Sequence, residues 1–146
     1  MLLTLAVVLF AGSEPFGEAS TSRPSAGVAQ QRFVLDEECA LRVGQTAELA
    51  AGTGVRLTFE AVRGDSRCPV GVSCIWAGDA VVAMTVHDTD GGPTTTELHT
   101  NVRFDAEAVL DGYVVRLVRL SPTPRVDATI EVDQYEALLV VDRLAK

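Results

Sequence analysis

The amino-acid sequence predicts an all-β protein, a single β-sandwich or small barrel of about seven or eight mostly antiparallel strands. From Arg32 onward, apolar and polar residues alternate with a period of two, which is typical of strands with one buried face. Gly, Pro or Asp interrupts this alternation about every ten residues, as turns between short strands do. Helical spacing is weak throughout, and a length of 146 residues fits one domain.

Each predicted strand follows from its own pattern of side chains. In residues 55–61 and 135–141, every second residue is apolar, so one face is expected to be buried. Residues 80–87 and 113–120 are more uniformly apolar and β-branched, which favours central positions in a sheet. The full set of predicted strands is residues 33–35, 46–50, 55–61, 80–87, 97–104, 113–120 and 135–141. The best helical candidate is residues 105–110, about one and a half turns.

Turn residues support this series of strands. Residues 88–93 read Asp-Thr-Asp-Gly-Gly-Pro and supply the positive-φ positions that a hairpin needs. His87 and His99 flank this hairpin and could be cross-strand neighbours, but exposed His on a strand is the default interpretation. Residues 121–124 read Ser-Pro-Thr-Pro and should end the preceding strand, because proline cannot donate to a ladder.

The N-terminal segment predicts export. Residues 2–11 form an uncharged apolar run, too short to span a bilayer but typical of the core of a secretory signal peptide. We therefore expect a signal peptide in residues 1–19, cleaved after residue 13 or 19, and a flexible linker in residues 20–31 before a β domain in residues 32–146. No basic residue precedes Arg23, so either the α-amino group supplies the positive charge or the true start lies upstream of Met1. Ser13 stands where a lipoprotein would carry its lipid-bearing Cys, so a lipid anchor is not predicted.

Composition and charge exclude several classes of partner. The chain has 12 basic and 20 acidic residues, a formal net charge of -8. Nucleic-acid binding depends mainly on Lys and Arg that neutralise phosphates, so no nucleic-acid partner is expected. A polybasic membrane patch is equally disfavoured, and no stable membrane insertion is expected after removal of the signal.

Three cysteines in an exported chain predict a disulfide and one leftover thiol. We favour Cys68–Cys74, because Pro69 and Gly71 between them can bend the chain back on itself. A bond from Cys39 to either of the other two is the alternative, and it would tie the N-terminal edge of the domain to this loop.

Residues 65–78 read Asp-Ser-Arg-Cys-Pro-Val-Gly-Val-Ser-Cys-Ile-Trp-Ala-Gly. This motif resembles a signature of small exported bacterial proteins, many of them described as lipoproteins, that have no assigned function. The resemblance extends more loosely over most of residues 43–141. It implies a β domain in the cell envelope, and it supplies no catalytic residues.

The residues of this motif suggest a braced corner or a recognition loop. Asp65 and Arg67 are expected to pair or to bind loop backbone, and Trp76 to pack on the disulfide. Gly78 would allow a neighbouring strand or side chain to approach closely.

No pattern of catalytic or metal-binding residues stands out. The spacing of Cys68 and Cys74 is not that of a zinc knuckle, and an oxidised pair could not ligate metal. The acidic turn beginning at Asp88 lacks the remaining ligands of a calcium loop. Because the nucleophile elbow and phosphate-binding glycine patterns are also missing, neither an enzyme nor a cofactor is predicted.

The sequence therefore predicts an exported envelope β domain, periplasmic or extracellular, that acts as a non-enzymatic binding or structural module. Its partner would be an envelope protein or surface ligand whose identity these patterns do not assign, and they do not set an oligomeric state. The alternative is a small protease inhibitor, in which Arg67 on the loop braced by Cys68–Cys74 enters a trypsin-like enzyme. A rigid loop suits that role because its ordering cost is met before binding.

Overall fold

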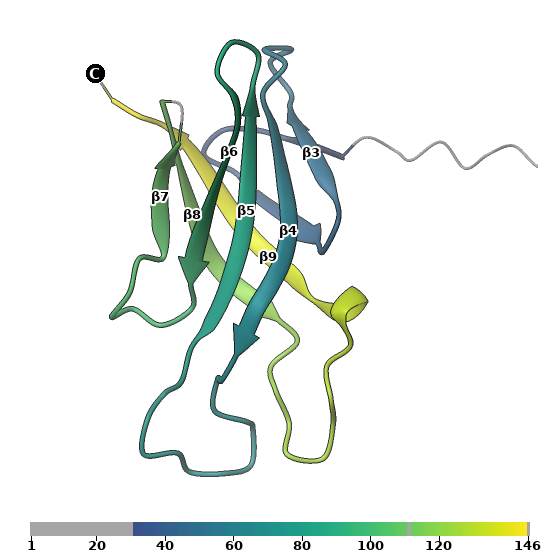
Figure 1. Cartoon of the computed structure of the whole chain (residues 1–146), viewed down its shortest axis with the longest axis vertical. Helices are drawn as coiled ribbons and strands as arrows, with labels where there is room; N and C mark the ends of the chain where they lie inside the picture. Colours follow the sequence, from purple (N-terminus) through teal and green to yellow (C-terminus); the bar gives the residue numbers. More distant parts are fainter. Residues whose placement is uncertain (1–30, 111, 146) are drawn as a thin grey trace, which may run out of the picture.

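The computed structural model describes residues 31–110 and 112–145, which form two β-sheets packed face to face (Figure 1). One sheet has five strands in the order β1-β3-β4-β5-β6, and the other has four in the order β2-β9-β8-β7. The all-β sandwich is thus confirmed, with nine strands and no closed barrel among the described residues. The elements are β1 (Gln31–Phe33), β2 (Glu38–Arg42), β3 (Thr46–Leu49), β4 (Arg56–Asp65), β5 (Ala80–Asp88), β6 (Gly92–His99), β7 (Glu107–Leu110), β8 (Tyr113–Ser121), a short 3-10 helix η1 (Val132–Gln134) and β9 (Glu136–Arg143).

The alternation seen in the sequence places one side of each sheet in the core. In and just before β4, Val55, Leu57 and Phe59 are buried, as predicted. Tyr135, Ala137, Leu139 and Val141 in and beside β9 are buried in the same way. The largest fully buried side chains come from both sheets: Phe59, Leu41, Leu57, Met84, Leu98, Leu139, Val82 and Val115.

All strand pairs are antiparallel except β1 with β3. The predicted hairpin joins β5 to β6, with Asp88 opposite Gly92. The strand before the Ser-Pro-Thr-Pro segment ends at Ser121, as expected. The prediction that residues 80–87 and 113–120 are central is also confirmed, since β5 lies between β4 and β6 and β8 lies between β9 and β7.

Two predictions around residues 97–110 are wrong. The strand predicted for residues 97–104 begins earlier and ends at His99, because the chain then turns and leaves Val102 exposed. The helix predicted for residues 105–110 is instead β7, which pairs with β8 from Glu107 opposite Arg116 to Leu110 opposite Tyr113. A helix of one and a half turns has too few internal hydrogen bonds to persist, whereas a neighbouring strand offers a complete ladder.

The two histidines that flank the hairpin are not cross-strand neighbours. His87 pairs with Pro93 beside the hairpin turn, whereas His99 pairs with Val81 at the other end of the same two strands. Strand β2 was not predicted, because only Cys39 and Leu41 mark its buried face.

Residues 1–30 lie outside the described part of the chain, and with them the expected signal peptide, its cleavage sites, Ser13 and most of the linker. Strand β1 starts at Gln31, one residue before the expected start of the β domain.

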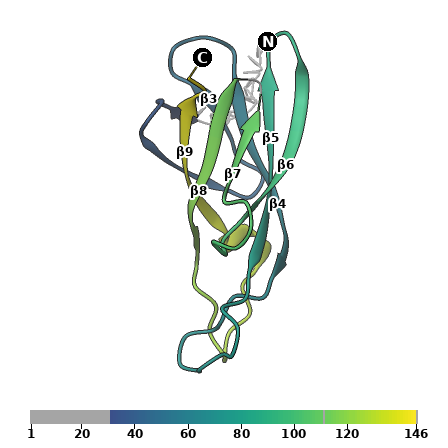
Figure 2. The same ribbon diagram turned by 90° about the vertical axis from the view of Figure 1, so that its left-hand side faces the viewer.

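Two long connections leave the sandwich at the same end of its long axis (Figures 1 and 2). One joins β4 to β5 and carries the cysteine motif, and the other joins β8 to β9. The turn between β5 and β6 lies at the opposite end (Figure 1).

Candidate functional site

The connection between β4 and β5 is closed by the predicted disulfide. Cys68 and Cys74 are bonded, with their Cα atoms 5.9 Å apart. In the chain-entropy model a loop of this size stabilises the fold by about 2.4 kcal/mol. Cys39 is a free thiol buried in β2, and burial raises its pKa. The alternative pairings through Cys39 are therefore not formed.

At the base of this loop, Asp65 and Arg67 form the pair that the sequence predicted. The Arg67 Nε donates to Asp65 Oδ1 at 2.8 Å, and Nη2 donates to Oδ2 at 2.6 Å. The Arg67 backbone N–H also donates to Asp65 Oδ1 at 3.1 Å. Both side chains are largely buried, with exposed fractions of 14% for Arg67 and 9% for Asp65. Such a two-pronged, shielded pair holds its geometry more firmly than a surface ion pair.

The same arginine ties the loop to the opposite sheet. Its Nη1 donates to the carbonyl of Leu120 at 2.6 Å, and Nη2 donates to the carbonyl of Pro122 at 2.9 Å. The hydroxyl of Tyr135 donates to Asp65 Oδ2 at 3.1 Å, so the approach to β9 joins the network. Because the guanidinium is engaged on every side, the structure gives no support to an inhibitor, which would need Arg67 free to enter a protease.

The hydrogen bonds and charges of this cluster shift the pKa values of Asp65 and Tyr135. Burial raises the pKa of Asp65, but the hydrogen bonds and charge of Arg67, with the Tyr135 hydroxyl, outweigh it and leave that pKa below its ordinary value. The pKa of Tyr135 is raised by its burial and by the neighbouring Asp65 carboxylate. Asp65 is thus held as a carboxylate, the form that Arg67 requires.

Gly78 marks the point where the two ends of the loop meet. Its φ of +69° is in the left-handed region, and a Cβ built on it would lie 1.8 Å from the carbonyl oxygen of Ser66. A close approach at Gly78 was predicted, and one is present, but the neighbour is the backbone of the same loop, not the strand or side chain that we expected from the sequence. Ser66 and Asp79 are further joined by a backbone hydrogen bond of 2.7 Å.

Asp79 is a structural residue that the sequence did not single out. Its Oδ2 lies 2.6 Å from Nδ1 of His99, and its Oδ1 accepts the backbone N–H groups of Thr100 and Asn101, each at 3.0 Å. Burial raises the pKa of Asp79, but these hydrogen bonds and the nearby imidazole lower it further than burial raises it. Its partners lie twenty or more residues along the chain, so no local motif could have identified it.

Beyond this base, residues 68–78 form what we call the braced tip, and its large apolar side chains face solvent. Ile75 is 92% exposed and Trp76 is 74% exposed, and Val70 and Val72 are about half exposed. The expectation that Trp76 packs away on the disulfide is therefore wrong, because most of the indole has no protein neighbour. Pro69 lies within the disulfide loop and, with Gly71 at a φ of +94°, turns the chain.

The connection between β8 and β9 runs beside the braced tip (Figure 2). The backbone N–H of Val70 donates to the carbonyl of Pro124 at 2.8 Å. Val126 on this second connection is also exposed, at 66%. The two connections thus support each other and add one more apolar side chain to the same end of the molecule.

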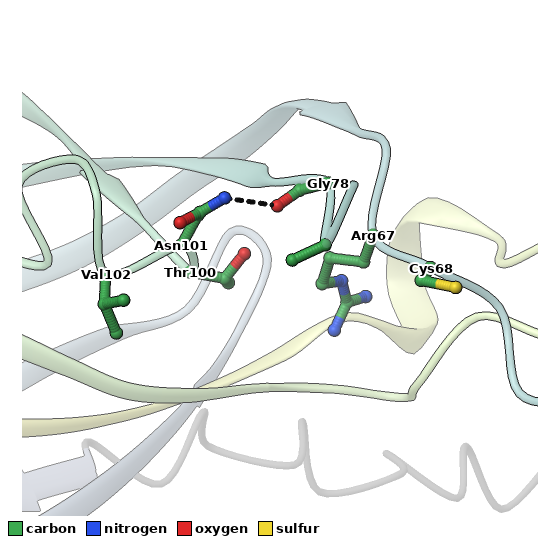
Figure 3. Close-up of a pocket in the computed structure, with 7 residues that line it drawn as sticks. Arg67, Cys68, Gly78, Thr100, Asn101 and Val102 are labelled. Carbon is green, nitrogen blue, oxygen red and sulfur yellow. Dashed lines mark hydrogen bonds between the residues drawn. The ribbon is translucent and has the colours of Figure 1, made fainter. Parts of the chain in front are cut away.

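An open pocket of about 430 Å³ lies at the base of the tip (Figure 3). On its rim the Asn101 side-chain amide donates to the carbonyl of Gly78 at 2.8 Å. Its lining residues are Arg67, Cys68, Ala77, Gly78, Thr100, Asn101 and Val102. Arg67 is the one charged side chain among them and is fully engaged, so the pocket offers no group for acid–base chemistry.

Among residues 31–110 and 112–145, no three His, Cys, Asp or Glu side chains come close enough to hold a metal ion. Within the same part of the chain, no helix has the length and apolar character to cross a membrane.

No family model matches this sequence, and neither the curated proteins nor the solved structures contain a match. In the part of the chain that the structure describes, fold and site together define a nine-stranded β-sandwich that carries a disulfide-braced, apolar loop at one end.

Proposed function

We propose that the protein is a non-enzymatic binding module, exported to the bacterial cell envelope, and that the braced tip is its recognition element. The observation that carries the proposal is the exposure of Ile75 and Trp76 on a loop fixed by a disulfide. Soluble domains rarely expose adjacent large apolar side chains without a binding role, and tryptophan is among the residues most enriched at binding hot spots.

The construction of the loop supports recognition. Loops held by a rigid scaffold carry binding function in many β-sandwiches. Here the disulfide, the Arg67 network and the close contact at Gly78 fix the loop before any partner arrives. A loop that is already ordered loses little entropy on binding, so its apolar contacts contribute more of their energy to affinity.

A capture experiment tests the proposal. Wild-type protein is immobilised beside an Ile75→Ser/Trp76→Ser variant and a Val109→Ser variant, and each is incubated with bacterial envelope fraction. Val109 is 59% exposed on β7 and lies outside the tip, so it controls for a general loss of surface hydrophobicity.

We expect the tip variant to retain about thirtyfold less envelope material than wild type, since hot-spot truncation costs on the order of 2 kcal/mol. The Val109→Ser variant should match wild type. Equal retention by all three proteins, or retention by none, would contradict a recognition role for the tip.

The disulfide provides a second variant for the same measurement. A Cys68→Ser/Cys74→Ser protein keeps Ile75 and Trp76 but loses the covalent brace. Because its loop must become ordered on binding, this variant should retain less envelope material than wild type and more than the Ile75→Ser/Trp76→Ser protein.

A further inference from the structure

The chemistry of the braced tip also indicates what it binds. From Cys68 to Gly78 the chain has eleven residues and no charged side chain. The charged residues on either side, Arg67 and Asp79, are turned inward and bonded within the protein. What the tip offers to a partner is apolar surface and one indole.

The size of this surface argues against a second protein chain as the partner. The tip and its neighbour expose five large apolar side chains: Val70, Val72, Ile75, Trp76 and Val126. A specific protein interface uses about 20–30 residues on each side and about ten direct hydrogen bonds. Within the tip, the backbone N–H groups of Cys68 and Val70 are bonded to the carbonyls of Ala77 and Pro124.

We propose that the braced tip docks shallowly into the surface of a zwitterionic phospholipid bilayer, with Ile75 and Trp76 entering the boundary between headgroups and acyl chains. This inference rests on the proposed function and names the class of partner. The tip projects from one end of the long axis of the sandwich, so it can enter a flat surface without steric conflict from the sheets (Figures 1 and 2). Tryptophan favours this boundary because its ring is apolar and its N–H is polar.

Charge selects the kind of lipid. The chain carries a formal net charge of -8, so anionic headgroups repel it. The nearest charges on the adjoining connection, Arg125 and Asp127, pair with each other at 3.7 Å and add no net attraction. Contact with a bilayer therefore depends on the apolar tip. It is peripheral and reversible, which is distinct from the stable insertion that the sequence argues against.

The only tryptophan in the chain is Trp76, so intrinsic fluorescence reports on the tip alone. The full chain is titrated with protein-free vesicles of phosphatidylcholine. Trp76 emission and its quenching by acrylamide are followed together with co-sedimentation. The vesicles are also made as an equal mixture with phosphatidylglycerol, and matched variants are Ile75→Asp in the tip and Val109→Asp on β7.

With phosphatidylcholine, we expect the emission of Trp76 to shift to the blue and its quenching to fall. Ile75→Asp should weaken partitioning at least about tenfold, because it places a charge where an apolar side chain enters the boundary. Val109→Asp should partition like wild type, and phosphatidylglycerol should weaken binding at low salt. Circular dichroism checks that each variant is folded, and since Ile75 is 92% exposed its replacement leaves the core untouched.

Three results would overturn the inference. One is an unchanged Trp76 spectrum, including the case where the chain sediments with vesicles through another segment such as residues 2–11. Another is an equal loss of vesicle partitioning in Ile75→Asp and Val109→Asp. The third is vesicle binding that becomes stronger when phosphatidylglycerol is included. If envelope fraction is captured through the tip while protein-free vesicles are not bound, the recognition role stands and the docking inference fails, because the partner is then an envelope component other than the phospholipid bilayer. If neither binds through the tip, the proposed function fails as well.

Discussion

Gly78 is the residue on which the geometry of the loop depends most directly. Its backbone has a φ of +69°, and the carbonyl of Ser66 occupies the space that any Cβ would need. Gly71 in the same loop has a similar backbone, with a φ of +94°, but open space around it. The two glycines therefore separate the effect of backbone strain from the effect of a steric clash.

We predict that Gly78→Ala lowers the free energy of unfolding by about 3 kcal/mol, since a backbone clash adds to the conformational strain. Gly71→Ala should lower the free energy of unfolding by only about 1 kcal/mol, the usual cost of placing a residue with a side chain in the left-handed backbone region. Urea unfolding followed by circular dichroism measures both values. Equal decreases in the free energy of unfolding of the two variants would show that the contact with Ser66 does not add to the cost of Gly78→Ala.

Trp76 shows how a residue's surroundings decide its role. An indole in a small β domain with few aromatic residues is expected in the core, where it buries a large apolar area. In this fold the core is filled by aliphatic side chains with four aromatic residues, Phe33, Phe59, Tyr113 and Tyr135, and Trp76 is 74% exposed on the loop. The exposure makes this residue a candidate for recognition.

At the scale of elements, Arg67 connects the end of β4 to the end of β8. Its guanidinium bonds Asp65 and also the carbonyls of Leu120 and Pro122. Arg116 on β8 is a contrasting case, because it pairs with Glu107 and Asp142 at the surface and is 48% exposed. Burial and the number of acceptors differ between the two arginines, although both form ion pairs.

We predict that Arg67→Lys lowers the free energy of unfolding by about 2 kcal/mol, because an ammonium cannot reproduce the planar fork that meets four acceptors. Arg116→Lys should change it by less than about 0.5 kcal/mol, as expected for an exposed pair. Chemical denaturation of the two variants beside wild type gives the comparison. If Arg67→Lys were as mild as Arg116→Lys, the arginine would not be what joins the sheets at this end.

At the scale of the whole molecule, two partly buried carboxylates, those of Asp65 and Asp79, lie at the end that carries the tip. Burial raises the pKa of both Asp65 and Asp79, but their hydrogen bonds and the neighbouring Arg67 and His99 side chains outweigh burial, so both pKa values lie below the ordinary value of 3.8. A carboxyl whose pKa is lower in the folded state stabilises the fold above its unfolded pKa. That contribution disappears as the pH falls through the folded pKa.

The free energy of unfolding should therefore be constant above about pH 5 with respect to these two groups, and decline as the pH falls below about 4. Asp65→Asn and Asp79→Asn should each be less stable at neutral pH and should show a flatter acid decline than wild type. Asp90→Asn, in the exposed turn at the opposite end, is the control and should keep the wild-type slope. Denaturant unfolding at a series of pH values measures these slopes, and parallel declines in all four proteins would contradict the assignment.

Much of the fold could be read from local pattern. The buried positions of β4 and β9 follow from the alternation that begins at Val55 and Tyr135, because a strand's side-chain period is two whatever its partner. The hairpin after Asp88 and the end of β8 at Ser121 follow from turn chemistry. Strand β7 did not follow, because its four residues acquire their conformation by pairing with β8.

The sequence by itself also determined the covalent and local parts of the site. The disulfide between Cys68 and Cys74, the pairing of Asp65 with Arg67 and the need for glycine at position 78 all involve residues within a short stretch. Side chains so close along the chain meet in most folds that turn there. Local pattern and short spacing were therefore enough to predict the class of fold and the contacts at the loop base.

Only the tertiary structure decided where these groups stand relative to the rest of the chain. It placed the carbonyls of Leu120 and Pro122 around Arg67 and so removed this residue from the surface. It also brought His99 to Asp79 and left Ile75 and Trp76 largely exposed to solvent. These outcomes depend on contacts between residues twenty to fifty-five positions apart, which hydrophobic periodicity and spacing do not encode. Burial and exposure, and with them the candidate function, are properties of the assembled sandwich.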